Sequence, residues 1–175
     1  MNKYRSHNCS ELTDKDSEKI VSLSGWLHRK RDHGNLLFID LRDHFGLTQC
    51  VIENNNKFFS FLEKTRPESV LTVSGSVIKR EKGTENLELS SGKIEIDIQL
   101  VKILSEANEL PMPVFGEHDY PEEIRLKYRF LDLRREEMHK NIILRSKIIS
   151  FIRSEMIKLG FLEYQTPILT SSSPE

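Results

Sequence analysis

The sequence predicts a mainly β fold with some α-helix: a small five-stranded barrel, then a hinge, then the truncated start of a second unit. Residues 19–104 contain five short runs in which apolar and polar residues alternate between turn signals, as in half-buried strands. Residues 136–159 instead repeat apolar side chains at intervals of three, four and seven, which is the spacing of a helix. The two patterns predict two structural units of different kinds.

The first unit is expected to begin with a polar surface arm, residues 1–18, that contains one helical turn. Gly25 inside the first strand predicts a bulge or a sharp bend, and Gly34 can adopt the positive φ of a tight turn. Three strands are expected first: one from Lys19 into the basic run Arg29-Lys30-Arg31, one at 36–42 and one at 47–52, joined by turns at 32–35 and 43–46. A short helix follows from Phe58, with a cap at 54–56 and a stop at Pro67. Two further strands, at 70–78 and from Lys93 to Leu104, are joined by a polar loop at 80–91.

This order, three strands, a helix and two strands, is that of the five-stranded OB barrel, which binds oligonucleotides on the face of its second and third strands. In the second strand, residues 37, 39 and 41 are apolar and form the core face. Phe38 is left on the opposite, charged face. Arg29, Lys30, Arg31 and Gln49 lie nearby, so cations, a ring and an amide are gathered as on a single-stranded nucleic-acid platform. An ordinary exposed strand with basic neighbours is the alternative reading.

The composition changes after Leu104. Residues 105–121 contain three prolines and a glycine with little periodicity, which predicts a hinge. A short helix is expected at 122–128 and a docked segment at 130–135. The helix of residues 136–159 ends at Gly160, and residues 161–166 are expected to begin a strand. The predicted domains are therefore 1–105, a hinge at 106–135, and a truncated unit at 136–175.

Overall composition narrows the function only slightly. The 26 basic and 27 acidic residues nearly cancel, so a nucleic-acid site has to be a local patch. Cys9 and Cys50 are too few for a disulfide framework, and His28 and His44 have no partners at metal-ligand spacing, so neither a structural disulfide nor a metal site is expected. There is no apolar leader and no run long enough to span a membrane, which favours a soluble, cytoplasmic protein.

Three blocks of sequence together resemble the bacterial-type aspartyl-tRNA synthetases of class II. They are the run from Gly25 to Asp43, the run Leu126-Lys-Tyr-Arg-Phe-Leu-Asp-Leu-Arg-Arg135, and the run from Gly160 to Leu169 followed by Ser173-Pro-Glu175. The third block fits motif 1 of class II synthetases, which in that family forms the helix and strand of the dimer interface. The resemblance covers essentially the whole chain.

The resemblance implies an anticodon-binding OB domain joined to a catalytic domain that activates L-aspartate with ATP and Mg²⁺ and esterifies tRNA-Asp as a homodimer. Motifs 2 and 3, which hold ATP, are not in this chain, so it is expected to be inactive alone. Glu175 would lie at the edge of the loop that closes over aspartate. Three alternatives remain. The chain could come from a related asparagine or lysine synthetase, it could be a stand-alone OB module that binds single-stranded RNA, or residues 136–175 could serve only for dimerisation.

The same resemblance implies site residues. Phe38 would stack on the central anticodon base and Gln49 would read it, Arg31 and Glu95 would contact the first base, and Arg80 would lie near the third. His33 and Gly83 stand where members that charge only tRNA-Asp tend to carry leucine and lysine. The chain therefore resembles the non-discriminating type, which also places aspartate on tRNA-Asn. Alternatively, His33 is an ordinary turn residue and Gly83 is a flexible position in its loop.

Overall fold

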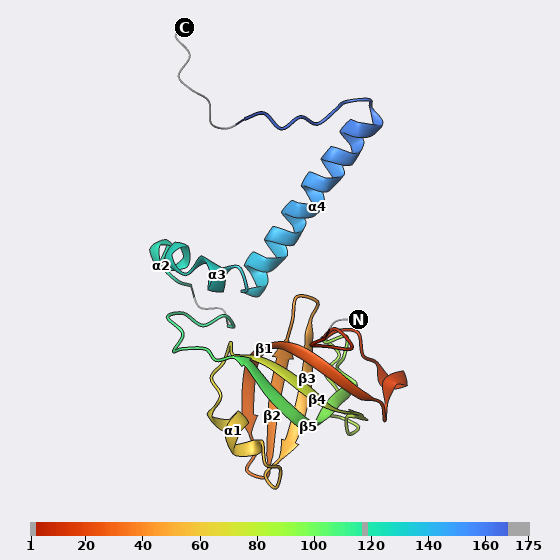
Figure 1. The fold of residues 1–175 in the computed structure, drawn as a ribbon, viewed down its shortest axis with the longest axis vertical. Coiled ribbons are helices and arrows are strands. Elements are labelled where there is room, and N and C mark those ends of the chain that lie inside the picture. Colours follow the sequence, from red (N-terminus) through yellow and green to blue (C-terminus); the bar gives the residue numbers. More distant parts are fainter. Residues whose placement is uncertain (1–2, 117–118, 168–175) are drawn as a thin grey trace. The chain divides into compact units, whose positions relative to one another are not determined.

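The computed structural model describes residues 3–116 and 119–167. The chain divides into two compact units, Met1–Leu110 and Pro111–Glu175. The domain boundaries that the sequence predicted, after residues 105 and 135, remain a prediction. The elements are, in order (Figure 1), η1 (Asp14–Asp16), β1 (Ile20–Asp32), β2 (Leu36–Arg42), β3 (Leu47–Glu53), α1 (Phe59–Lys64), β4 (Val70–Lys79), β5 (Ile94–Ser105), α2 (Glu122–Lys127), α3 (Arg129–Asp132) and α4 (Glu136–Lys158).

The five strands of the first unit form a closed barrel in the order β1-β2-β3-β5-β4, with β1 also paired to β4. All neighbouring strands are antiparallel except β3 and β5, which run parallel. Closure leaves no long unpaired edge. The predicted OB barrel is confirmed, and its second strand has the bounds that the sequence predicted.

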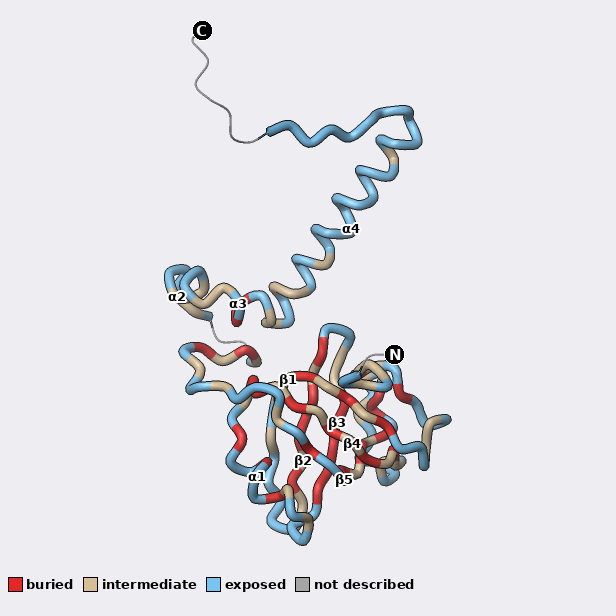
Figure 2. Tube along the Cα trace, in the orientation of Figure 1, coloured by how far each residue is buried: buried red, intermediate tan, exposed pale blue. Residues whose placement is uncertain are grey.

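The alternation of side chains fills the barrel, as Figure 2 shows by the red segments along the strands. In β2, Leu37, Ile39 and Leu41 are at most 1% exposed, which confirms the predicted core face. Leu62 of α1 lies in the same core. Before this helix, the Oδ1 of Asn56 accepts a hydrogen bond from the backbone N–H of Phe58 at 3.0 Å. The predicted asparagine cap of the helix was nevertheless wrong, because the N-cap residue of α1 is Phe58 and the helix has no side-chain cap.

The bulge expected at Gly25 lies elsewhere. The register between β1 and β2 shifts between Leu27 and Arg29, while Gly25 pairs regularly with Leu71 of β4. A Cβ at Gly25 would collide with the carbonyl oxygen of Arg42. This glycine is therefore required by the close approach of two strands.

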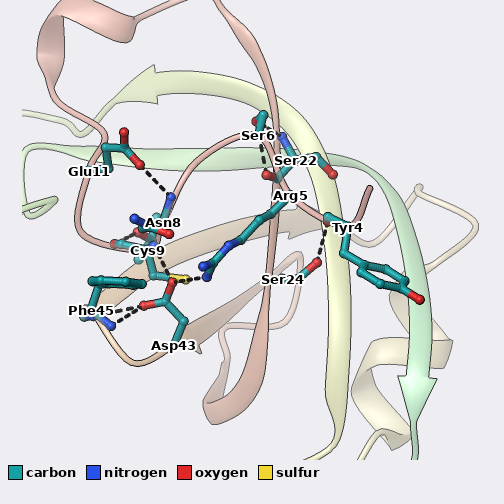
Figure 3. A network of polar contacts seen from close by, with 12 residues as sticks. Tyr4, Arg5, Ser6, Asn8, Cys9, Glu11, Ser22, Ser24, Asp43 and Phe45 are labelled. Carbon is teal, nitrogen blue, oxygen red and sulfur yellow. Dashed lines mark hydrogen bonds and ion pairs between the residues drawn. The ribbon is translucent and has the colours of Figure 1, made fainter. Parts of the chain in front are cut away.

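The N-terminal segment is not merely a surface arm, and that prediction was wrong for two of its residues. Cys9 and Leu12 are fully buried in the barrel core, and burial raises the pKa of the Cys9 thiol to about 12. The expected helical turn is present as η1. Segment and barrel are also joined by polar contacts, because Ser6 and Ser22 exchange hydrogen bonds (Figure 3).

Asp43 lies at the centre of this attachment (Figure 3). Its Oδ2 pairs with Arg5 Nη1 at 3.0 Å and accepts the backbone N–H of Cys9 at 3.1 Å. Its Oδ1 accepts the backbone N–H groups of Phe45 and Gly46 at 2.8 and 3.0 Å. One carboxylate thus fixes both the β2–β3 turn and the chain segment that precedes η1.

In the second unit, the buried carboxylate of Asp132 accepts a hydrogen bond from Arg125 at 3.0 Å and pairs with Arg129. The helix predicted at 136–159 is confirmed as α4. It ends at Gly160, whose φ is 87°, in a Schellman motif, because Phe161 N–H reaches the carbonyl of Met156. No residue of α4 that the structure describes is buried.

The strand expected at residues 161–166 does not form: residues 161–167 have no regular secondary structure. A strand needs a neighbour to satisfy its backbone groups, and the part of the second unit that the structure describes contains none. None of the described helices is long and apolar enough to cross a membrane.

Candidate nucleic-acid interface

A pocket of about 800 Å³ opens on the outer face of the barrel. It is built from residues of all five strands together with the loop that follows β4. Six of the residues predicted from the sequence line it, namely Arg31, His33, Phe38, Gln49, Arg80 and Glu95. Gly83 belongs to the same loop but not to the pocket wall, and Glu175 lies outside the described residues.

Strand register explains why these side chains meet. Arg31 of β1 lies opposite Phe38 of β2, and Asp40, two residues further along the same face, lies opposite Gln49 of β3. Because β5 runs beside β3, it brings Glu95 to the other side of Gln49. Residues from four strands therefore converge on one patch through alternation and pairing alone.

A chain of hydrogen bonds crosses the pocket floor. Arg31 Nη2 donates to Asp40 Oδ1 at 2.9 Å and to Gln49 Oε1 at 2.8 Å. Gln49 Nε2 in turn donates to Glu95 Oε2 at 2.7 Å. The amide that was predicted to read a base is thus held at both ends, by a cation on its oxygen and a carboxylate on its nitrogen.

Phe38 is half-buried, and its ring meets the ring of His33 almost perpendicularly, at 87°, with 5.4 Å between centroids. Such a contact has a favourable edge-to-face geometry. The hairpin residue His33 is therefore coupled physically to the ring that was predicted to stack on a base.

Arg80 reaches the pocket from the end of β4. Its Nε donates to the carbonyl of Ile94 at 3.1 Å and its Nη1 to that of Thr84 at 3.4 Å. Nη2 is buried and has no hydrogen-bond partner among the described residues. Burial lowers the pKa of the guanidinium, while the charges of Glu95 and Asp40 oppose that fall. A buried donor without a partner is costly, and a ligand acceptor would satisfy it.

Gly83 lies in the exposed loop after β4 with a φ of 91°, and open space surrounds the position where a Cβ would be. A side chain there would meet no obstacle but would have to adopt an unfavourable backbone conformation. The conformation of this loop is thus tied to the glycine.

The sequence reading missed several residues of the pocket. Asp40 was recognised only as a charged neighbour of Phe38, although its i, i+2 spacing already places both on one face. Asn86 and Asp97, which the sequence did not indicate, also line the pocket, as does Arg29, which the sequence placed among the cations near Phe38. Asn86 lies in an irregular loop, where no periodicity indicates the direction of a side chain.

The pocket combines three arginines, an aromatic ring, an amide and carboxylates. Cations suit phosphates, the ring suits an unstacked base, and the amide and carboxylates suit base edges. The described residues include no group of three or more histidine, cysteine, aspartate or glutamate side chains arranged to hold a metal ion.

Comparison with known proteins agrees with this geometry. Residues 21–103 match the family described as "OB-fold nucleic acid binding domain". Residues 121–175 match "tRNA synthetases class II (D, K and N)". The two matches follow the order of the two structural units.

Curated relatives are similar over all 175 residues. Identity is 63% with an aspartate–tRNA(Asp/Asn) ligase of Pelagibacter ubique and 58% with that of Phenylobacterium zucineum, and in both cases the whole of this chain aligns with 30% of the relative.

Solved structures share the fold. An asparaginyl-tRNA synthetase from Pyrococcus horikoshii superposes with a TM-score of 0.80 at 26% identity, over 94% of this chain and 38% of that one. An aspartyl-tRNA synthetase from Entamoeba histolytica gives 0.79 at 22% identity, over 89% and 38%. The chain thus combines an OB-fold nucleic acid binding domain with a match to the class II tRNA synthetases (D, K and N), is similar over its whole length to bacterial aspartate–tRNA(Asp/Asn) ligases, and spans about 30% of the length of these curated relatives.

Proposed function

We propose that this chain is the anticodon-binding part of an aspartate–tRNA ligase, a homodimeric enzyme of the cytoplasm. The full-length enzyme would activate L-aspartate with ATP and Mg²⁺ and transfer it to tRNA-Asp, whereas this chain alone would bind tRNA without catalysing the reaction. The convergence of Arg31, Phe38, Gln49, Arg80 and Glu95 on one pocket is the observation that carries the proposal.

Each part of the pocket has a role in this reading. Phe38 stacks on the central base of the anticodon, an interaction worth about 1–3 kcal/mol for any base. Gln49 reads the edge of that base, and Arg31 and Glu95 contact the first base, where a carboxylate can accept from the amino group of a guanine. The unpartnered Nη2 of Arg80 donates to an acceptor on the third base.

Binding to an anticodon stem-loop of tRNA-Asp tests this proposal. Phe38→Ala is expected to weaken binding by about 5- to 150-fold, because the stacking surface is lost. Phe45→Ala is the matched control, since Phe45 is another solvent-accessible phenylalanine of the barrel but lies in the β2–β3 turn, outside the pocket. Equal binding by Phe38→Ala and the unaltered chain would remove the stacking role.

We further propose that the enzyme accepts tRNA-Asn as well. The anticodons of tRNA-Asp and tRNA-Asn differ only in the third base, so one or two contacts, worth about 1–3 kcal/mol, would decide between them. His33 contacts Phe38, and Gly83 shapes the loop that carries Thr84, the partner of Arg80. The curated relatives at 63% and 58% identity bear the name aspartate–tRNA(Asp/Asn) ligase.

Aminoacylation of both transcripts by the full-length enzyme tests dual specificity. The unaltered enzyme is expected to charge both, and the double substitution His33→Leu with Gly83→Lys to favour tRNA-Asp. Rejection of tRNA-Asn by the unaltered enzyme would overturn this proposal and leave the anticodon-binding role intact.

A further inference from the structure

Asp40 is the most deeply buried acid of the pocket floor. The residue is 8% exposed, whereas the side chain of its partner Arg31 is 42% exposed. Burial raises the pKa of the Asp40 carboxyl, and the charges of Arg31 and Arg29 oppose that rise. Burying a carboxylate in a strand lowers the stability of the fold. The presence of Asp40 at this position therefore indicates a role beyond packing.

The position of Asp40 is fixed by the sheet. Its backbone pairs with Arg29 on one side and with Gln49 on the other, so the carboxylate has little freedom. Arg31 has a long, flexible side chain, and one of its nitrogens, Nη2, donates to both Asp40 Oδ1 and Gln49 Oε1. The short acid therefore anchors the long cation in the place where it meets the amide.

The consequence lies in the orientation of the Gln49 amide. Arg31 requires an oxygen on its side, and Glu95 requires a nitrogen on the other. After these bonds, Oε1 keeps one free lone pair and Nε2 one free hydrogen. The pocket thus presents an acceptor and a donor in a fixed order.

That order distinguishes the two pyrimidines. On its Watson–Crick edge uracil offers the N3–H donor beside the O4 acceptor, whereas cytosine offers the N3 acceptor beside the N4 amino donor. An amide held in one orientation pairs with uracil, and the same amide rotated by half a turn pairs with cytosine in the same position. Fixing the amide therefore fixes the base.

We propose that Asp40 is a positioning residue that, through Arg31, holds the Gln49 amide in the orientation that selects uracil over cytosine as the central base of the anticodon. This inference rests on the proposed anticodon-binding function, because anticodons for aspartate and asparagine carry uracil at that position. Asp40 itself does not contact the base.

The test measures binding of the complete 175-residue chain to two stem-loop RNAs that differ only in a central uracil or cytosine. Asp40→Ala is expected to lower the ratio of the two affinities by about fivefold or more, which is part of the discrimination available to a bidentate contact. Asp40→Asn, which keeps an oxygen for Arg31, should restore most of the ratio. A purely structural role would lower both affinities and leave their ratio unchanged.

Glu68→Ala is the matched control. Glu68 is also a buried acid that pairs with an arginine, Arg42, but it does not line the pocket, so its removal should leave the ratio unaltered. If Asp40→Ala does not fold, Asp40→Ser, whose hydroxyl is too short to reach Arg31, should give the same drop.

Two outcomes would overturn the inference. An unchanged ratio in Asp40→Ala, or an equal drop in Glu68→Ala, would show that Asp40 does not position the amide. A lack of preference for uracil in the unaltered chain would instead contradict the proposed function itself, so the two failures can be told apart.

Discussion

Asp43 shows how much a single side chain can fix in this fold. Its carboxylate pairs with Arg5 and accepts three backbone N–H groups, from Cys9, Phe45 and Gly46. Hydrogen bonds to a charged group are stronger than those between neutral groups, and buried donors left without an acceptor are costly. The N-terminal segment and the β2–β3 turn therefore depend on the same residue.

We expect Asp43→Ala to lower the free energy of unfolding by about 2–4 kcal/mol, because several donors lose their acceptor together. Urea denaturation measures this loss. Asp14→Ala, at an exposed acid of η1, is the control and should change stability by less than about 0.5 kcal/mol. Similar losses in the two variants would show that the Asp43 contacts do not stabilise the fold.

At the scale of elements, the sequence predicted what alternation and turn chemistry determine. The bounds of β2, the positive φ of Gly34 at 78° and the end of α4 at Gly160 all follow from short-range rules. Gly25 was misread because a glycine in a strand can mark either a bulge or a close approach, and only the position of Arg42 in the neighbouring strand decides between them.

The limits of the site prediction have the same cause. Phe38 could be placed on the outer face from alternation alone. The network that joins Arg31, Gln49 and Glu95 could not be predicted, because it depends on the register between β1, β2 and β3 and on the pairing of β3 with β5, which is distant in sequence. The strand expected after Gly160 failed for a related reason, since local β-propensity cannot supply a missing neighbour.

The α4 helix carries a prediction of its own. Its large apolar side chains are exposed, including Ile148, Ile149, Ile152 and Met156, which are 40–54% accessible. Their spacing of three and four residues places them on one side of the helix. Contiguous exposed apolar surface of this kind is typical of an interface, which supports the proposed homodimer.

We expect the complete chain to self-associate and Ile152→Glu to shift it to monomer, because a charge cannot be buried unpaired in an apolar interface. Light scattering coupled to size-exclusion chromatography measures the mass. Ser150→Glu places the same charge on the opposite side of α4 and should leave the association intact. A monomeric unaltered chain with a helical circular-dichroism signal would contradict this assignment of the apolar side.

At the scale of the whole molecule, binding and association are assigned to different units. Every residue of the pocket lies between Arg29 and Asp97, within the unit Met1–Leu110. The barrel core is likewise formed by residues of this unit. Nothing in the pocket or the core that the structure describes requires a side chain from Pro111 onward.

The isolated segment 1–110 should therefore fold and bind the stem-loop of tRNA-Asp with the affinity per chain of the complete 175-residue protein. Its affinity should fall as the salt concentration rises. The attraction to RNA comes from the local arginines and not from the net charge of the chain, which is −1, and salt screens such local charges. If Arg29, the arginine of the pocket that is not assigned to a base, neutralises one phosphate, the logarithm of the association constant should decline with a slope of about −0.7 against the logarithm of salt concentration.

Fluorescence anisotropy over a range of salt concentrations measures both quantities, and thermal melting by circular dichroism reports whether 1–110 is folded. A segment 1–119 serves as the control for the cut itself, since it adds only residues outside the pocket. A folded 1–110 that binds at least tenfold more weakly than the complete chain would show that the second unit contributes to RNA binding, because a tenfold change corresponds to about 1.4 kcal/mol of lost contact. Equal affinities with the same salt dependence would place the whole RNA site in the barrel.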